Sequence, residues 1–319
     1  MQRRRLGRSG PEVPPIVLGG NVYGWTLNEE QSLRQLDRAV DLGLNFIDTA
    51  DVYSRWAPGH QGGESETIIG KWFAKSGKRK DVILATKVGM DMGDRKKGLS
   101  AGYIEQAVEA SLRRLQTDYI DLYQAHTDEE VTWQEETLGA FNKLVRSGKV
   151  RYIGASNYVG GRLASAINLS RENGWAEYIS LQPHYNLLER ANFERDLLPV
   201  VKKYELGVIP YFALAAGFLT GKYRRGSDAS AAARGGMVKK YFNDHGFAVT
   251  DAVHDVAARH DVSPAQVALA WLVAQPGVTA PIASATSDQH LDDLVGATTL
   301  RLTDEDLRSL NEVSAGVAA

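Results

Sequence analysis

Cysteine is absent from the chain, which has 319 residues. Without cysteine the protein has no disulfide bonds, no thiolate ligands for a metal and no cysteine nucleophile. The segment Met1–Leu6 is basic, but no apolar stretch follows it, so we expect no secretory signal peptide. Both observations fit a cytoplasmic protein, and this is the location that we expect.

The sequence also lacks an excess of charge of one sign and a long apolar run. It holds 37 Lys and Arg against 39 Asp and Glu, which gives a formal net charge of −2. This balance is not typical of proteins that bind nucleic acids or anionic membranes. The longest apolar stretch, Val208–Leu219, has about 12 residues and is too short to span a bilayer. We therefore expect neither nucleic acid nor a membrane as a partner.

Several motifs of common enzyme classes are missing. No Gly-x-Gly occurs, so the Rossmann dinucleotide fingerprint is absent, and no Gly-Lys pair precedes Ser or Thr as a P-loop requires. The segment Gly98–Gly102 matches the Gly-x-Ser-x-Gly pattern of a nucleophile elbow. The polar residues Asp94–Lys97 precede it, however, where that turn requires a strand. There is no His-Glu-x-x-His, and we expect no bound metal.

Short apolar runs, rich in β-branched and aromatic residues, recur along the chain. They are Ile16–Leu18, Phe46–Ile47, Val82–Ala85, Tyr119–Tyr123, Tyr152–Ala155, Tyr178–Leu181, Val208–Tyr211 and Val278–Ile282. Because most of these runs are nearly continuous rather than alternating, they predict strands that are buried on both faces.

Amphipathic stretches lie between the apolar runs. Helical spacing or capping residues predict helices over Glu29–Leu42, Tyr103–Leu115, 264–274 and Leu307–Val313. Strands that alternate with helices indicate a parallel sheet, either an open sheet or a closed barrel. Eight βα units in a chain of this length favour the closed (β/α)₈ or TIM barrel. No linker interrupts the pattern, so residues 1–319 are predicted to form a single α/β domain.

Two segments fall outside this repeat. Short β-prone pieces flank Gly7–Gly10, and residues 1–14 are therefore predicted to form an N-terminal β-hairpin; a disordered tail is the alternative. The second segment begins with the small residues of Ser227–Gly236, and we expect a mobile loop over 227–247.

Polar residues directly follow most of the predicted strands. They are Asp48, Lys87, His126, Ser156, Asn157, Gln182 and Tyr211, and Tyr53 lies in the loop after Asp48. In a (β/α)₈ barrel the carboxyl ends of the strands meet at one mouth, which carries the active site. Because buried polar groups need partners, we expect these side chains to interact with one another there.

Four of these residues form a coherent chemical group. A phenol has a reference pKa of about 10, and a neighbouring ammonium group lowers it. Lys87 is expected to act in this way on Tyr53, with Asp48 holding Lys87 protonated. His126 is expected to donate a hydrogen bond to a substrate oxygen. A proton donor beside such a site suits carbonyl reduction, for which a cofactor must supply the hydride.

The motifs around these residues resemble those of the aldo-keto reductase family. The matching segments are Phe46–Ser54, Gly62–Glu66, Leu84–Lys87, Asp118–His126, Gly148–Asn157, Leu181–Asn186 and Leu219–Tyr223. They occur in the family's order, and the resemblance extends from the first hairpin to about Gly296.

The resemblance implies an NAD(P)H-dependent oxidoreductase that reversibly reduces small aldehydes or ketones. It makes Tyr53 the general acid, His126 the residue that orients the carbonyl, and Lys87 with Asp48 the pair that tunes Tyr53. A different kind of function is a regulatory subunit of the same fold, which binds the cofactor with little turnover. The partner is then a small-molecule carbonyl or alcohol; the sequence does not specify an oligomeric state.

The resemblance also implies a cofactor site. It assigns Ser156, Asn157 and Gln182 to the carboxamide of the nicotinamide, Tyr211 to stacking on the ring, and Asp48 to the same end of the site. Gly20 and Asn21 are expected beside the cofactor, and the backbone amides of Phe212, Leu214, Gly217 and Leu219 are expected to hold its pyrophosphate. Ser284, Thr286 and His290 are expected at its adenosine end. The adenosine end is expected in the loop 283–294, at a helix N-terminus.

One feature departs from the family pattern. Many relatives carry Arg or Lys in this last loop to hold the 2′-phosphate of NADP, whereas this chain has hydroxyl groups and His290 there. The charge of Asp288 is expected to repel a phosphate. NADPH is the cofactor favoured by the resemblance, and NADH is the alternative.

Further residues are predicted at the mouth of the barrel. Trp25, Trp56 and Met90 are expected either to line an apolar substrate pocket or to pack at its rim. His184 follows Gln182 at the mouth, where it has either a functional or a packing role.

Overall fold

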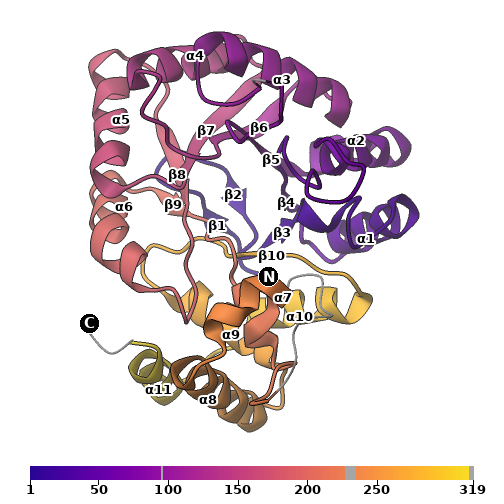
Figure 1. Cartoon of the computed structure of the whole chain (residues 1–319), viewed down its shortest axis with the longest axis vertical. Helices are drawn as coiled ribbons and strands as arrows, with labels where there is room; N and C mark the ends of the chain where they lie inside the picture. The colour runs from indigo at the N-terminus through magenta and orange to yellow at the C-terminus, as the bar shows by residue number, and fades with distance from the viewer. Residues whose placement is uncertain (95, 227–234, 316–319) are drawn as a thin grey trace.

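The computed structural model describes residues 1–94, 96–226 and 235–315. Its centre is a parallel sheet of eight strands in the order β10-β3-β4-β5-β6-β7-β8-β9, curled so that helices surround it (Figure 1). The strands are β3 Val17–Gly19, β4 Phe46–Asp48, β5 Ile83–Val88, β6 Ile120–Ala125, β7 Val150–Ser156, β8 Tyr178–Gln182, β9 Gly207–Val208 and β10 Ile282–Ala283. This arrangement confirms the predicted (β/α)₈ fold.

The two edge strands of the sheet meet and close the barrel. Val208 in β9 forms a parallel bridge with Val278, and Thr279 donates its backbone N–H to the carbonyl of Val208 at 2.8 Å. Both edge strands are shorter than the apolar runs that predicted them. Pro210 and Pro281 lie within those runs, and proline has no N–H for a strand ladder. Backbone hydrogen bonds nevertheless cross the seam beyond the two short strands, including one from Ile282 to the carbonyl of Pro210 at 2.9 Å.

Helices cover the outside of the barrel (Figure 1). They are α1 Glu29–Asp41, α2 Glu64–Ser76, α3 Ala101–Leu115, α4 Gln134–Arg146, α5 Gly160–Glu172, α6 Leu198–Tyr204, α8 Asp244–His260, α9 Pro264–Ala274, α10 Asp288–Thr299 and α11 Asp304–Ser314. Asn28, Ser263 and Thr303 accept the backbone N–H bonds that begin α1, α9 and α11. Within the described ranges, no helix is long and apolar enough to cross a membrane.

The predicted hairpin is present and closes the end of the barrel opposite the mouth. Its strands are β1 Arg4–Arg5 and β2 Glu12–Val13, paired antiparallel. Leu6 between them is fully buried and belongs to the apolar cluster inside the barrel. Gly7 has φ +65°, and a Cβ there would lie 2.3 Å from the carbonyl oxygen of Ile179. Glycine at this position therefore allows the hairpin to pack closely against the barrel.

The loop expected over 227–247 falls partly outside the described residues, which omit 227–234. From residue 235 onward the chain is helical, with α7 Gly235–Val238, a short 3₁₀ turn over Lys239–Tyr241 and then α8. Val238 and Tyr241 are buried, and the ring centroid of Tyr241 lies 5.6 Å from that of Phe218. Aromatic packing thus gives this segment a regular structure that its composition does not predict.

Candidate active site

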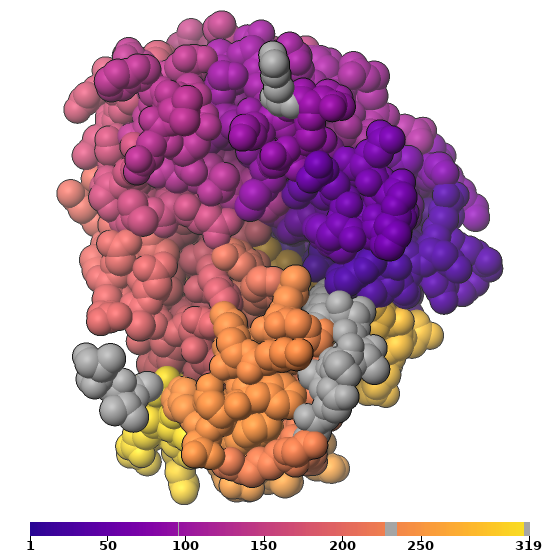
Figure 2. Space-filling model, viewed as in Figure 1, coloured from indigo at the N-terminus to yellow at the C-terminus, as the bar shows by residue number. Residues whose placement is uncertain are grey.

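A cavity of about 1310 Å³ opens at the carboxyl ends of the strands. Figure 2 shows this face hollowed near its middle, between the violet N-terminal part and the orange segment that contains α7. The predicted residues that line the cavity are Asn21, Asp48, Tyr53, His126, Ser156, Asn157, Gln182, Tyr211, Phe212, Leu214, Gly217, Ser284, Thr286 and His290. Trp25, Trp56 and Met90, predicted at the mouth, line it as well.

Lys87 connects Asp48 and Tyr53 at the floor of the cavity. Its Nζ donates to Asp48 Oδ2 at 2.7 Å, to the carbonyl oxygen of Thr49 at 2.8 Å and to the hydroxyl of Tyr53 at 2.9 Å. The three ammonium hydrogens therefore each have an acceptor. Lys87 is fully buried and Asp48 is 1% exposed, so the pair is shielded from water beneath Tyr53.

Burial and charge act in opposite directions on this group. Burial lowers the pKa of Lys87, but Asp48 and Tyr53 raise it more, so the net pKa lies above its ordinary value and Lys87 remains a cation. Burial raises the pKa of Tyr53, while Lys87 lowers it and Asp48 raises it further. The net effect is that the pKa of Tyr53 lies above its ordinary value. The expected effect of Lys87 is present, but burial outweighs it, and the phenol is a protonated donor at neutral pH.

His126 follows β6 and lies beside Tyr53, with 6.0 Å between the ring centroids. Burial and the charge of Lys87 hold the pKa of His126 well below its usual range, so the imidazole is neutral. Its Nδ1 has no hydrogen-bond partner within the part of the chain that the structure describes. Because an unpaired N–H is rarer in proteins than an unpaired acceptor, we assign the proton to Nε2.

Gln124 is a member of the site that our sequence reasoning did not assign. Its side chain is fully buried and donates from Nε2 to Asp48 Oδ1 at 3.2 Å, beside a second bond to the same oxygen from Gln182 at 2.9 Å. Gln124 and His126 are two residues apart, and side chains at that spacing share one face of a strand. The two-residue period of a strand is therefore the sequence signal that could have identified Gln124.

The residues assigned to the nicotinamide end form a connected group. Asn157 donates from Nδ2 to the carbonyl oxygen of His126 at 2.9 Å and accepts at Oδ1 from the hydroxyl of Tyr211 at 2.8 Å. Ser156 donates to the carbonyl oxygen of Gln182 at 2.9 Å. These bonds fix several polar groups on one wall of the cavity, next to Tyr53 and His126.

After β9 the backbone enters an unusual conformation. Phe212, Ala215 and Ala216 have φ angles of 51°, 48° and 55°, and Gly217 has φ 97°. A Cβ at Gly217 would lie 3.1 Å from Nζ of Lys222. Lys222 lines the cavity, and our sequence reasoning gave it no role although it lies in the matching segment Leu219–Tyr223. This turn therefore presents a cation and a side-chain-free backbone to the cavity.

Two predicted cofactor residues do not line the cavity. Gly19 lines the cavity, whereas its neighbour Gly20 does not. The carbonyl of Gly20 accepts a hydrogen bond from Ser65 Oγ at 2.7 Å. Leu219 is 1% exposed and packs in the core, because the turn presents Thr220 and Lys222 to the cavity in its place. The prediction for Leu219 concerns its backbone amide rather than its side chain, so both residues remain predicted neighbours of the cofactor.

The loop after β10 forms the other end of the cavity. Ser284 donates from Oγ to Asn21 Oδ1 at 2.5 Å, and the backbone N–H of Thr286 donates to His290 Nδ1 at 3.3 Å. Asp288, which we expected to repel a phosphate, pairs with Arg38 at 3.4 Å. Arg38 also holds Asp292 at 2.8 Å, so one cation partly offsets both carboxylates.

A nicotinamide dinucleotide fits this cavity. The volume exceeds the roughly 300–1,000 Å³ of common ligand pockets, which leaves room for a long cofactor and a substrate. A Cβ at Gly19 would lie 2.6 Å from Ser284 Oγ, so glycine keeps the wall open there as it does at Gly217. Lys222 supplies a cation for phosphate, and hydroxyl groups and a helix N-terminus lie near His290.

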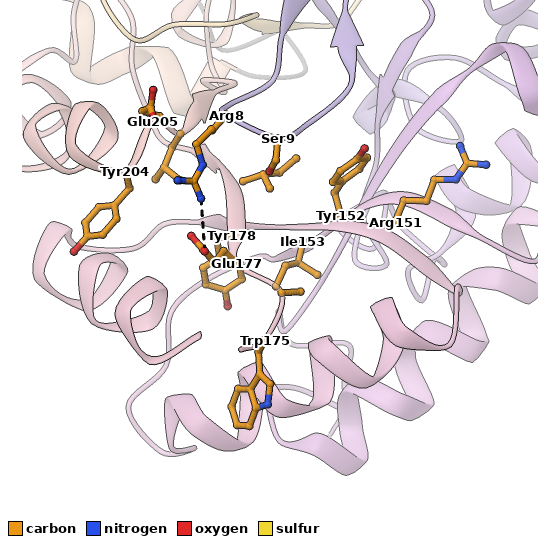
Figure 3. Close-up of a pocket in the computed structure, with 13 residues that line it drawn as sticks. Arg8, Ser9, Arg151, Tyr152, Ile153, Trp175, Glu177, Tyr178, Tyr204 and Glu205 are labelled. Carbon is orange, nitrogen blue, oxygen red and sulfur yellow. Dashed lines mark ion pairs between the residues drawn. The ribbon is translucent and has the colours of Figure 1, made fainter. Parts of the chain in front are cut away.

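A second, smaller cavity of about 210 Å³ lies by the hairpin turn, near the N-terminal ends of β7 and β8 (Figure 3). Arg8 and Glu177 form an ion pair across it at 3.8 Å, and Arg151 pairs with Asp121 at 2.8 Å. Its lining residues do not include Tyr53 or any other residue of the predicted site. This cavity is therefore separate from the chemistry at the mouth.

Comparison with known proteins identifies the family to which the chain belongs. The sequence model of the "Aldo/keto reductase family" matches residues 15–315. The chain is 37% identical over 324 residues to the "Uncharacterized oxidoreductase YrpG" of Bacillus subtilis (strain 168), covering 99% of this chain and 97% of that protein. It is 33% identical over 344 residues to the "Versiconal hemiacetal acetate reductase" of Aspergillus parasiticus, covering 98% and 96%.

A relative of another kind is the "Probable voltage-gated potassium channel subunit beta" of Oryza sativa subsp. japonica. It is 31% identical over 299 residues, covering 91% of this chain and 89% of that protein. The match of the family model over nearly the whole chain, the oxidoreductases among the relatives and the barrel fold agree with one another. The chain is an oxidoreductase that belongs to the aldo/keto reductase family.

Proposed function

We propose that this protein reversibly reduces small aldehydes or ketones to alcohols, with NADPH as the favoured reductant. The observation that carries the proposal is the placement of Tyr53 on the cavity wall, with its hydroxyl 2.9 Å from Nζ of a fully buried Lys87 and with a neutral His126 beside it. This group combines a proton donor with a second hydrogen-bond donor for the same carbonyl oxygen.

The cofactor, when bound, supplies the hydride that no side chain can provide. We assign Ser156, Asn157, Gln182 and Tyr211 to its nicotinamide end, and Ser284, Thr286 and His290 to its adenosine end. Lys222 and the left-handed turn at Gly217 also line the cavity, and we assign them to the phosphates. Polar side chains that are already fixed by hydrogen bonds lose little freedom on binding, which favours affinity.

Tyr53 donates its phenolic proton to the carbonyl oxygen of the substrate. As the proton leaves, negative charge develops on the phenol oxygen, and the ammonium of Lys87 stabilises it. Asp48 keeps Lys87 charged and oriented. His126 donates from Nε2 to the carbonyl oxygen and thereby holds the carbonyl in reach of Tyr53. In the reverse direction, Tyr53 takes the proton back from the alcohol.

The test follows the decay of NADPH absorbance with a panel of aldehydes and ketones, and is repeated with NADH. We expect turnover with the intact protein and a loss of kcat of about 10²- to 10⁴-fold for Tyr53→Phe, because general acid catalysis contributes about this much. Full activity of Tyr53→Phe would contradict the assignment of Tyr53. Tight NADPH binding by the intact protein without turnover of any carbonyl would instead support the regulatory-subunit alternative.

A further inference from the structure

Tyr211 on the cavity wall has a second aromatic ring behind it. The ring of His184 stacks on that of Tyr211 with 5.2 Å between the centroids and 16° between the planes. The two residues also form a parallel backbone bridge, in which Tyr211 donates its N–H to the carbonyl of Pro183 at 3.0 Å. Tyr211 lines the cavity and His184 is not among its lining residues, so His184 supports Tyr211 from the side away from the cavity.

The segment that contains His184 also fixes Phe212, the residue after Tyr211. Phe212 has φ 51°, which is unusual for a bulky side chain and persists only where its surroundings fix it. Asn186 donates from Nδ2 to the carbonyl oxygen of Phe212 at 2.9 Å. This Nδ2 also lies 3.4 Å from Nε2 of His184, so His184 and Asn186 form one contact group. Tyr211 and Phe212, both on the cavity wall, are thus held by one short stretch of chain.

Charged groups of opposite sign lie near His184. Burial lowers the pKa of His184; Glu189 raises it and Lys240 lowers it. Glu189 accepts from Lys240 Nζ at 2.5 Å and from the hydroxyl of Tyr241 at 3.0 Å. The ring of Phe212 meets His184 edge-on at 5.5 Å. His184 is therefore a neutral ring at neutral pH, in an environment that does not favour its protonation.

We propose that His184 is a positioning residue, which fixes the ring plane of Tyr211 so that the opposite face of Tyr211 is ready to receive the nicotinamide. The inference rests on the proposed function, because it assumes that the cofactor stacks on Tyr211. The neutral state of His184 matters, since an oxidised nicotinamide is cationic. Positive charge on His184, behind Tyr211, would weaken binding of the oxidised cofactor more than that of the reduced one.

The test compares His184→Ala, which removes the stack, with His184→Phe, which keeps a flat ring and removes the titratable group. Dissociation constants for NADPH and NADP⁺ are measured by fluorescence titration at pH 7.5 and at pH 5.5. At pH 7.5 we expect His184→Ala to weaken both cofactors about 2- to 10-fold, as loss of an aromatic stack predicts. His184→Phe should bind both within about twofold of the intact protein.

The comparison of the dissociation constants at the two pH values tests the charge of His184. Because burial lowers the pKa of His184, the ratio of the NADP⁺ and NADPH affinities should change between pH 7.5 and 5.5 no more in the intact protein than in His184→Phe. Both cofactors carry the same 2′-phosphate, which the ratio removes, and both proteins retain His126 and His290, which the comparison of the two proteins removes. If His184→Ala does not fold, the comparison of the intact protein with His184→Phe still decides this test. A loss of NADP⁺ affinity relative to NADPH at pH 5.5 that occurs in the intact protein and not in His184→Phe would show a charged His184 and overturn its proposed neutral state.

A readout without cofactor separates this inference from the proposed function. In ligand-free protein labelled with fluorotyrosine, the Tyr211 signal should shift or broaden in His184→Ala and remain sharp in His184→Phe; assignment uses Tyr211→Phe. An unchanged Tyr211 signal in His184→Ala, with unchanged cofactor affinity, would overturn the positioning role. If the intact protein binds neither NADPH nor NADH, the proposed function fails, but the Tyr211 signal still reports whether His184 holds that ring.

Discussion

Lys87 lies against Tyr53 in two ways, with its Nζ 2.9 Å from the hydroxyl and 4.5 Å from the centroid of the ring. The ammonium therefore contacts both the oxygen that would lose a proton and the face of the aromatic ring. It is also the cation that compensates the buried Asp48. Stability and chemistry thus depend on the same side chain.

Lys87→Met tests both consequences. We expect kcat to fall at least about 100-fold, and the free energy of unfolding to fall by about 3–5 kcal/mol because Asp48 is left as an unpaired buried charge. Carbonyl-dependent NADPH oxidation and thermal unfolding by circular dichroism measure the two effects. Lys202→Met, at an exposed position on α6, is the matched control and should change neither. Wild-type stability in Lys87→Met would contradict the proposed compensation of Asp48.

Asp51 should make the protein less stable as the pH rises. Its side chain is 2% exposed, and neither carboxyl oxygen has a hydrogen-bond partner within the described residues. Burial, with a contribution from Glu66, raises the pKa of Asp51 to about 8, although Arg114 and Lys87 lower it. Arg114 Nε is bonded to Glu66 at 2.7 Å, so this cation is already paired. The folded protein therefore favours the protonated form of Asp51.

The sign of the pH effect follows from this shift. The folded-state pKa lies above the unfolded value, so the contribution of Asp51 to stability is most favourable below pH ~4 and declines as the pH rises from ~4 to ~8. Asp51→Asn cannot ionise and should be more stable than the intact protein by about 2–5 kcal/mol at pH 8, with little difference at pH 4. Urea unfolding at both pH values measures this. The exposed Asp255→Asn is the control, and destabilisation by Asp51→Asn at pH 8 would refute the prediction.

Gly217→Ala should weaken cofactor binding without changing the proton-transfer step. The added Cβ would lie 3.1 Å from Nζ of Lys222, at a backbone φ of 97° that is strained for alanine. We expect the KM for NADPH to rise about 10-fold with kcat nearly unchanged, because strain of about 1–3 kcal/mol displaces the turn. Gly161→Ala, which has open space around the new Cβ, should behave as the intact protein. An unchanged KM would remove this turn from the cofactor site.

Gln289→Arg should increase the preference for NADPH over NADH. Gln289 lines the cavity from the first turn of α10, within a segment, 283–294, that has no Arg or Lys. A charge-assisted bond to a 2′-phosphate is worth about a factor of 10 in affinity. Dissociation constants for NADPH and NADH measure the preference. Thr299→Arg, at the far end of α10, adds the same charge and should have no such effect. Equal tightening of both cofactors by Gln289→Arg would place the 2′-phosphate elsewhere.

The order of the strands and the residues at their ends could be predicted from the sequence because nearly continuous apolar runs are a strong signal. The lengths of β9 and β10 could not, since Pro210 and Pro281 interrupt the ladders within runs that remain apolar. Tyr53 illustrates a different limit. The cation beside it was predicted, but the depth of burial that raises its pKa depends on packing between segments distant in sequence.

The sheet seam has a consequence for the protein without its cofactor. Tyr211 and Phe212 follow β9 on one side of the seam, and Ser284 and Thr286 follow β10 on the other. A molecule that spans these walls connects the two sides of the seam, so part of its binding free energy becomes resistance to local opening there. In hydrogen exchange, the amides of Thr279 and Ile282 should then be the ones most protected when the cavity fills.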